Sequence, residues 1–117
     1  MLIERTYHLL MRVFALIMLL GATAHAKPLK EGSKAEVRAD FDLICNAVQR
    51  SGAAGEKDPS RKAQKIADYL LSHIATKQAM SFMQSMGGML PEEKAPALKK
   101  KARESGYTGA CPFADEK

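Results

Sequence analysis

The sequence predicts a small all-α domain, a bundle of three to four short helices with an irregular C-terminal tail stapled by one disulfide. After residue 32, apolar residues recur at intervals of three and four, which is the periodicity of amphipathic helices. No stretch alternates apolar and polar residues for long enough to predict a strand. The chain has two cysteines, Cys45 and Cys111, and one bond between them would tie the tail to the first helix.

The first 26 residues have the features of a cleavable secretory signal peptide. Two arginines precede an uncharged apolar run at 13–24, and the small-x-small triplet at 24–26 stands directly before Lys27. Such a run is short for a membrane-spanning helix, which takes about 20 residues, so the alternative of an uncleaved anchor is disfavoured. We expect residues 27–117 to be one exported domain, periplasmic or secreted, without a transmembrane anchor after cleavage.

Composition narrows the class of protein. Lys and Arg number 18 against 13 Asp and Glu, a formal net charge of +5. Residues 1–26 contain two of the bases and one of the acids, so the exported part stays basic. That part has no Trp, two Cys and a single His, His73. So short a chain, with so few catalytic or metal-binding side chains, argues against multi-domain enzymes, zinc-finger arrays and charge-relay hydrolases.

The first helix is predicted over residues 33–51, after an exposed lead-in at 27–32. Ser33 and Glu36 form a capping box, in which each side chain accepts a hydrogen bond from the other residue's backbone amide. Gly52 supplies the left-handed residue that ends many helices. The buried stripe is expected to consist of Val37, Phe41, Ile44, Cys45 and Val48, flanked or opposed by Arg38, Asp40, Asp42, Asn46 and Gln49.

The second helix is predicted over residues 59–75 and the third over 77–86. Asp58 can cap the second helix, and Pro59 suits its first position. Its stripe is Ala63, Ile66, Ala67, Leu70, Leu71 and Ile74. Beyond Ile74 the apolar positions shift by roughly 100° around the axis. Either the helix bends near Thr76 or a new helix begins there.

The fourth helix is predicted over residues 92–104. Two acidic residues follow Pro91 and suit the positive end of a helix macrodipole. Pro96 is expected to interrupt this helix, so that the main run starts at Pro96, with Ala95, Leu98 and Ala102 facing inward. Gly106 is expected to end the helix, and the tail that follows is irregular.

Cys45 and Cys111 are expected to form an intramolecular disulfide, because an even number of cysteines in an oxidising compartment favours pairing. They lie 66 positions apart. For a loop of that length the chain-entropy model gives a stabilisation of ~4 kcal/mol. An intermolecular bridge and a redox-active pair are the alternatives. Redox pairs usually lie two residues apart in the sequence, which disfavours the last.

Four methionines follow one another at intervals of three: Met80, Met83, Met86 and Met89. Thioethers prefer Cu(I), so two or three of these side chains could bind a copper ion, joined by His73 if the chain bends. All four cannot face one point, because each step of three turns the side chain by about 300°. The alternatives are ordinary core packing and an exposed, adaptable surface for a partner.

A basic cluster of Lys99, Lys100, Lys101 and Arg103 lies on the fourth helix. It can dock on an anionic surface, such as a membrane leaflet, lipopolysaccharide or an acidic partner protein. The alternative is an ordinary solvated helix face. Nucleic acid is disfavoured as a partner, because the protein is expected to be exported and no aromatic residues interleave with the bases.

Catalysis has little support in the sequence. His73 has no fixed carboxylate neighbour, which is a poor basis for acid–base chemistry. The chain contains no glycine-rich phosphate loop, metalloprotease helix, nucleophile elbow or zinc spacing. We therefore expect no enzyme activity and no catalytic residue.

The leading hypothesis is an exported, non-enzymatic helical protein that binds either another envelope protein or an anionic surface. The first alternative is a periplasmic Cu(I) carrier that uses the methionine segment, and otherwise no cofactor is expected. In general build the exported part is similar to small acid-stress chaperones of bacteria, which are helical, of comparable length and carry one long-range disulfide. This similarity of architecture implies an acid-activated holdase as a second alternative and implies no site residue.

Overall fold

The structure is a computed structural model that describes residues 28–115. The predicted signal peptide at 1–26 lies outside the described residues, as do Lys27 and residues 116–117. The described part is all-α, as predicted, and one isolated parallel bridge joins Lys30 to Thr76. In chain order the helices are α2 (Lys34–Cys45), α3 (Ala47–Arg50), the 3₁₀ helix η1 (Ala53–Gly55), α4 (Pro59–His73), α5 (Lys77–Met86), α6 (Pro91–Glu104) and the 3₁₀ helix η2 (Pro112–Asp115).

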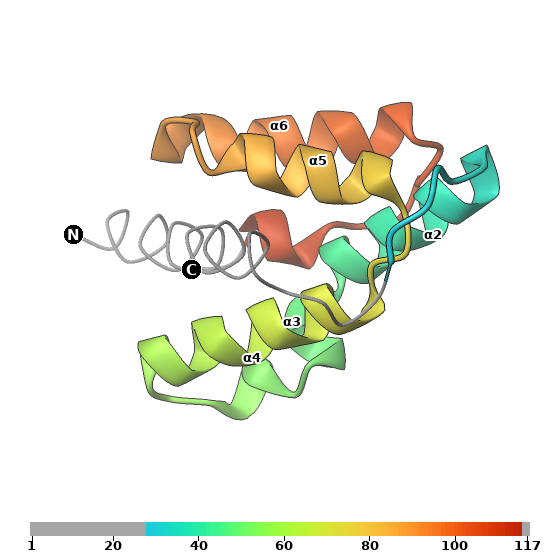
Figure 1. Cartoon of the computed structure of the whole chain (residues 1–117). Coiled ribbons are helices and arrows are strands. Elements are labelled where there is room, and N and C mark those ends of the chain that lie inside the picture. Colours follow the sequence, from blue (N-terminus) through green and yellow to red (C-terminus); the bar gives the residue numbers. More distant parts are fainter. Residues whose placement is uncertain (1–27, 116–117) are drawn as a thin grey trace.

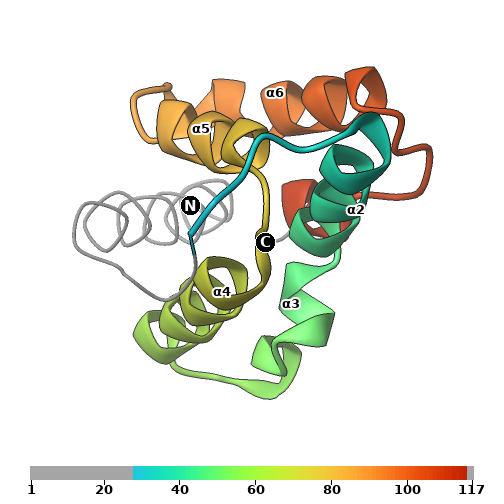
Figure 2. The same ribbon diagram turned by 45° about the vertical axis from the view of Figure 1, so that its right-hand side comes forward.

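Helix α2 is the central element of the fold. It contacts α3, α4, α5, α6 and η2. Helices α5 and α6 lie on one side of the molecule, and α3, η1 and α4 lie on the other (Figures 1 and 2). The stripe predicted for α2 therefore meets neighbours from both sides, which explains why Phe41, Ile44 and Cys45 are fully buried, while Val37 is half-buried.

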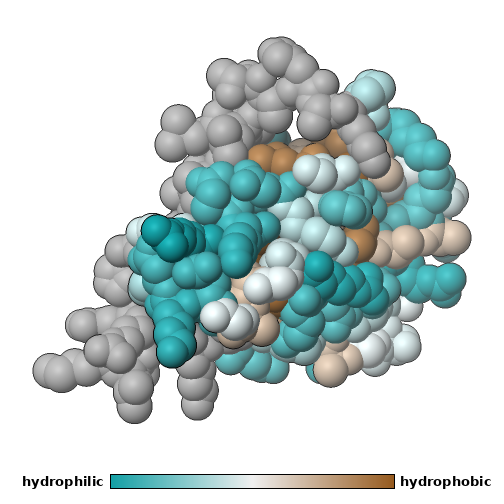
Figure 3. Space-filling view, turned by 90° about the horizontal axis from the view of Figure 1, so that it is seen from below, coloured by the Kyte–Doolittle hydropathy of each residue, from teal (hydrophilic) through white to brown (hydrophobic). Residues whose placement is uncertain are grey.

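The core contains apolar side chains from every α-helix. Phe41 of α2 packs against Phe82 of α5 with tilted rings, whose centroids lie 5.6 Å apart. The largest apolar side chains without exposed surface are Phe41, Ile44, Ile66, Leu70, Ile74, Met83, Met86 and Phe113. Burying one such side chain contributes about 1.5–3 kcal/mol. Seen from the side of η1 and α4, the outer surface is mostly hydrophilic, with small hydrophobic areas between polar ones (Figure 3).

The predicted first helix is interrupted at Asn46, so the continuous helix over 33–51 is wrong. Asn46 has φ −109° and ψ 17°, outside the helical region. Its side-chain amide donates to the carbonyl oxygen of Asp42 at 2.9 Å and to the hydroxyl of Tyr107 at 3.2 Å. Asparagine can compete with the backbone for helix hydrogen bonds, and here the competition separates α2 from α3. The capping box at Ser33 and the left-handed Gly52, with φ 78°, are confirmed.

A new helix begins after Thr76, which decides between the two alternatives for this region. Helix α4 ends at His73, two residues before the predicted end, because Ile74 is extended with ψ 128°. The Thr76 hydroxyl accepts a hydrogen bond from the Ala79 amide at 3.3 Å and so caps α5. The predicted bounds 77–86 of the third helix are confirmed.

Helix α6 runs through Pro96, so the predicted interruption is wrong. Pro96 lies near the start of a helix that begins at Pro91. Its missing amide leaves only the carbonyl of Glu92 without a helix partner. Both Pro96 and Glu92 are exposed, so water can bond that carbonyl and the local cost stays small.

The segment before α2, expected to be an exposed lead-in, is attached to the start of α5. The Lys30 amide donates to the Ala75 carbonyl at 3.1 Å, and the Lys77 amide donates to the Lys30 carbonyl at 2.8 Å. A side chain at Gly32 would clash, because a Cβ there would lie 2.9 Å from Thr76 Cβ. The glycine permits this close approach.

The predicted disulfide between Cys45 and Cys111 is confirmed. It joins the last residue of α2 to the tail, with the two Cα atoms 4.3 Å apart. Directly after Cys111, η2 buries the ring of Phe113. The tail is therefore fixed to α2 by a covalent bond and by burial of an aromatic ring.

Candidate functional site

The predicted basic cluster does not form one surface. Lys99 Nζ binds Asp115 Oδ1 at 2.6 Å, and Lys99 and Arg103 border a small hollow beside Cys111. Lys101 borders two different hollows, on the side of α6 that meets α2 and α5. Lys100 is exposed. Of the four basic residues, only Lys101 lines a hollow together with basic residues of other helices.

Lys101 belongs to an open groove between α2 and the end of α6, which we call the α2–α6 groove. It has a volume of about 660 Å³. Its lining residues are Gly32, Lys34, Ala35, Val37, Arg38, Gln78, Lys101, Glu104, Ser105 and Gly106. Lys34 and Arg38 come from α2, where residues four apart share one face, and Lys101 comes from α6. The two α2 cations were not predicted as site residues, because their proximity to α6 depends on the tertiary fold.

A second hollow adjoins the α2–α6 groove. It has a volume of about 470 Å³ and is lined by Glu31, Lys77, Gln78, Ser81, Phe82, Ser85 and Lys101. Gln78 and Lys101 line both hollows. Lys77 adds a further cation on this side, and the half-buried Phe82 ring adds an apolar surface.

Arg38 lies beside the turn that follows α6. Gly106 has φ +91°, and a Cβ there would lie 3.5 Å from Arg38 Cδ. The aliphatic stem of Arg38 therefore runs over a residue without a side chain. The Tyr107 amide donates to the Ala102 carbonyl at 3.0 Å and keeps this turn closed. A cation of α2 thus lies beside the end of α6.

The cations of the groove take no part in the internal ion pairs. Within residues 28–115, five ion pairs join side chains: Lys30–Glu36, Arg50–Asp42, Arg61–Asp58, Lys65–Glu56 and Lys99–Asp115. None of them includes Lys34, Arg38 or Lys101. Among the described residues that line the groove, Glu104 is the one acidic residue. The groove therefore has an excess of positive charge that the described part of the chain does not neutralise.

Glu36 lies in the first turn of α2 and has a partner of its own. It pairs with Lys30, and its Oε1 accepts a hydrogen bond from the Ser33 amide at 3.0 Å. Chiefly the bond to Lys30, and then those to Ser33, lower the pKa of Glu36 from 4.5 to about 2. Glu36 is thus paired with Lys30 and with none of the groove cations.

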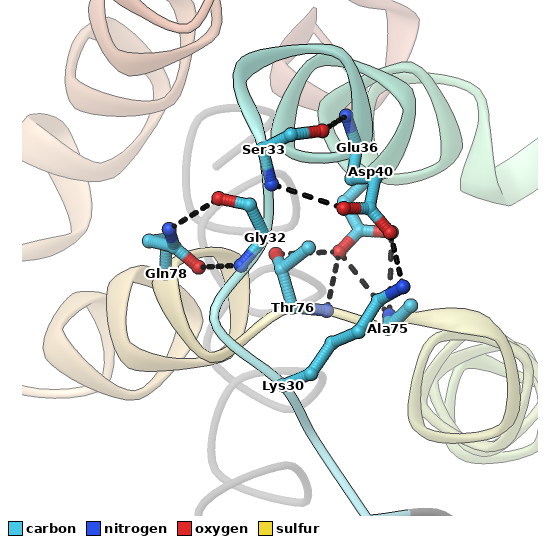
Figure 4. Close-up of polar contacts among 8 residues, drawn as sticks. All are labelled: Lys30, Gly32, Ser33, Glu36, Asp40, Ala75, Thr76 and Gln78. Carbon is cyan, nitrogen blue, oxygen red and sulfur yellow. Dashed lines mark hydrogen bonds and ion pairs between the residues drawn. The ribbon is translucent and has the colours of Figure 1, made fainter.

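A buried carboxylate, Asp40, which is 3% exposed, joins α2 to the start of α5. Its Oδ2 accepts hydrogen bonds from the Thr76 amide at 2.8 Å and the Thr76 hydroxyl at 2.7 Å (Figure 4). The Ala75 amide lies within 3.2 Å of the same oxygen. Nearby, Gln78 exchanges two 2.9 Å hydrogen bonds with the backbone of Gly32. We call these contacts of Asp40 and Gln78 the clamp, because they fasten α2 and the segment before it to the start of α5.

The placement of Asp40 on the polar side of its helix was expected and is wrong. Asp40 lies at positions i+3 from Val37 and i−4 from Ile44, within the apolar stripe itself. A carboxylate in such a register requires several donors when it is buried. The signal was therefore present in the sequence, although the donors on Ala75 and Thr76 were not predictable from it.

Lys94 is a second buried charged residue that sequence analysis missed. It is 2% exposed, and burial lowers the pKa of its ammonium group. Lys94, Leu98 and Ala102 stand four residues apart on the same face of α6. The spacing of four residues from Leu98 therefore indicates a buried position for Lys94, although a lysine there was not expected to be buried.

The methionines of the predicted Cu(I) segment lie in the core. Met83 and Met86 have no exposed surface, Met80 is 7% exposed, and Met89 packs against the same cluster. His73 is exposed at the end of α4, where its ring stacks on Tyr69 with 4.3 Å between centroids. This placement favours core packing, and the copper site remains a prediction. Among residues 28–115, no three or more His, Cys, Asp and Glu side chains are grouped as a metal site requires.

Comparisons with protein-family models, with curated proteins and with solved structures each found no match to this chain. None of the helices described between residues 28 and 115 combines the length and the apolar character needed to cross a membrane.

Proposed function

We propose that the protein is an exported, non-enzymatic binding protein that docks on an anionic surface of the cell envelope through the α2–α6 groove. One observation carries this proposal. Lys34 and Arg38 on one wall and Lys101 on the other have no ion-pair partner within residues 28–115, and Glu104 is the one acidic lining residue.

The physical basis is electrostatic attraction focused by a concave surface. Cations that line a cleft with low-dielectric walls raise the local concentration of anions more than the same cations on a flat surface. Each base near an anionic leaflet contributes ~1 kcal/mol, so three bases contribute on the order of 3 kcal/mol. Salt weakens this attraction, because the Debye length is about 10 Å at 0.1 M salt.

Vesicle binding tests the proposal. The protein recovered from the exported fraction is mixed with vesicles of phosphatidylcholine alone and with vesicles that also contain an anionic phospholipid. We expect binding to the anionic vesicles only, and weaker binding as salt increases. The triple variant Lys34→Gln, Arg38→Gln, Lys101→Gln should lose most of this binding. A protein that ignores anionic vesicles at low salt contradicts the proposal.

A matched variant controls for net charge. Lys57, Arg61 and Lys65 lie on the η1–α4 side of the molecule and can also be changed together to Gln. Both triple variants lose three positive charges, so a diffuse effect of net charge would weaken both equally. Docking through the groove predicts that the η1–α4 variant keeps most of its affinity.

The clamp favours a second candidate function, an acid-activated holdase. Asp40 holds the start of α5 through hydrogen bonds from the Ala75 amide, the Thr76 amide and the Thr76 hydroxyl. Loss of the clamp would loosen α5 and expose its buried methionines, which suit adaptable binding. Near-ultraviolet circular dichroism and binding of a hydrophobic dye below about pH 3 test this candidate. Native packing at that pH contradicts it.

A further inference from the structure

We propose that the α2–α6 groove binds one phosphomonoester headgroup of a membrane lipid, an inference that rests on the docking function proposed above. The groove would then be a discrete site for one ligand and not a diffuse basic surface. Charge balance, the presence of a guanidinium group among the cations and the shape of the groove each support it.

The charge of the groove matches a doubly charged anion. Lys34, Arg38 and Lys101 supply three positive charges, and Glu104 supplies one negative charge. A phosphomonoester has a charge of about −1.5 to −2 near neutral pH. A phosphodiester or a carboxylate has a single negative charge, which would leave part of the positive charge of the groove without a counterpart.

Arg38 supplies the geometric part of recognition. A guanidinium group donates two parallel hydrogen bonds to phosphate oxygens, whereas an ammonium group acts as a point charge. The stem of Arg38 passes beside Gly106, where an added Cβ would lie 3.5 Å from Cδ. Arg38 is exposed, so its guanidinium group is accessible to a ligand in the groove.

The remaining lining residues explain why the ligand is a headgroup with attached apolar atoms. The side-chain amide of Gln78 already exchanges two hydrogen bonds with the backbone of Gly32, so it is not available to bind the ligand. Ala35 and Val37 present apolar surface between the cations of α2. The glycerol portion of a lipid can cover this surface while its phosphate lies among the cations.

Calorimetric titration with soluble lipids tests the inference on the protein recovered from the exported fraction. The probes are a short-chain phosphatidic acid, which is a phosphomonoester, a short-chain phosphatidylglycerol, which is a phosphodiester, and inorganic phosphate. We expect saturable binding of one phosphatidic acid per chain, about tenfold tighter than either other probe. Amide resonances of Gly32 and Gly106 should shift during the same titration.

Two conservative variants separate the guanidinium fork from charge alone. Arg38→Lys keeps the charge but removes the fork, so phosphatidic acid should bind about fivefold to tenfold more weakly. Arg61→Lys makes the same change on the exposed side of α4 and should leave binding unchanged. Circular dichroism verifies that both variants remain folded.

The outcomes distinguish the inference from the proposed function. If anionic vesicles bind through the groove cations but the monoester shows no preference over the diester, docking stands and the headgroup site is wrong. Binding of inorganic phosphate as tightly as phosphatidic acid would assign the groove to the free anion and overturn the lipid assignment. If neither vesicles nor soluble lipids bind, both proposals fail.

Discussion

The outer face of η1 and α4 and the α2–α6 groove contain the same kinds of charged residue in opposite arrangements. Near α4, Arg61 pairs with Asp58 and Lys65 pairs with Glu56. In the groove, Lys34, Arg38 and Lys101 come from two helices, and none has such a partner within residues 28–115. The comparison shows that the number of bases does not determine where positive charge is left without an ion-pair partner. That depends on whether local acids pair with the bases.

The largest effect should come from removing the disulfide, which holds the tail against α2. Replacing Cys45 and Cys111 by Ser should lower the free energy of unfolding by ~4 kcal/mol in the chain-entropy model. Urea denaturation measures this loss. The tail that follows Gly106 would then lose its covalent bond to α2, so vesicle binding should weaken as well, while the η1–α4 face remains as it is. Unchanged vesicle binding would show that the groove does not depend on the tail.

The next largest effect concerns the buried carboxylate of the clamp. Asp40→Ala leaves the donors of Ala75 and Thr76 without their acceptor and should cost about 3 kcal/mol of unfolding free energy. Asp68→Ala is the matched change on the exposed side of α4, where the carboxylate accepts a bond from Gln64. It should cost less than about 0.5 kcal/mol. Equal losses in urea denaturation would show that the clamp does not contribute more than an exposed carboxylate.

A smaller effect separates two neighbouring lysines of α6. Lys101→Gln removes a groove cation and should weaken binding to anionic vesicles about fivefold, the equivalent of ~1 kcal/mol per base. Lys99→Gln removes a cation that already pairs with Asp115 and should have little effect. Vesicle co-sedimentation at low salt measures both. Equal losses would mean that the bases of α6 act as one diffuse patch.

The smallest effect is the pH dependence contributed by Glu36. Its pKa is lowered in the folded protein to about 2, so this carboxylate stabilises the fold above its ordinary pKa of 4.5. That stabilisation is lost as the pH falls from about 4.5 towards 2. Thermal unfolding followed by circular dichroism from pH 6 to pH 2 should show a flatter profile for Glu36→Gln. An unchanged profile would show that the pair with Lys30 does not contribute.

Much of the local structure could be predicted from the sequence, because its signals are local. The capping box at Ser33, the start at Pro59 and the bounds 77–86 depend on neighbouring residues and were correct. The break at Asn46 was not predictable in the same way, since one bond of its side chain reaches Tyr107, 61 residues away. The predicted interruption at Pro96 was wrong, because the cost of a proline inside a helix depends on whether the carbonyl that loses its helix partner is exposed to water.

The candidate groove was predicted only in part. Lys101 was recognised as part of a basic run, but nothing in that run distinguishes it from Lys99 or Lys100. The difference arises from the approach of α2, which brings Lys34 and Arg38 to the same groove. Asp40 and Lys94 could have been identified as buried from their spacing, whereas their tertiary surroundings could not.

The bond between Cys45 and Cys111 also constrains the order in which the molecule can be completed. Cys45 at the end of α2 and Cys111 in the tail are 66 positions apart, so α2 meets its last partners only after α3, α4, α5 and α6 have been synthesised. Contacts of such high sequence separation slow folding, because a long loop must close before they are made. A product truncated before Cys111 would lack both the covalent tie and the ring of Phe113. Synthesis of the tail that contains Cys111 and Phe113 is thus the step that allows α2 to make its last contacts.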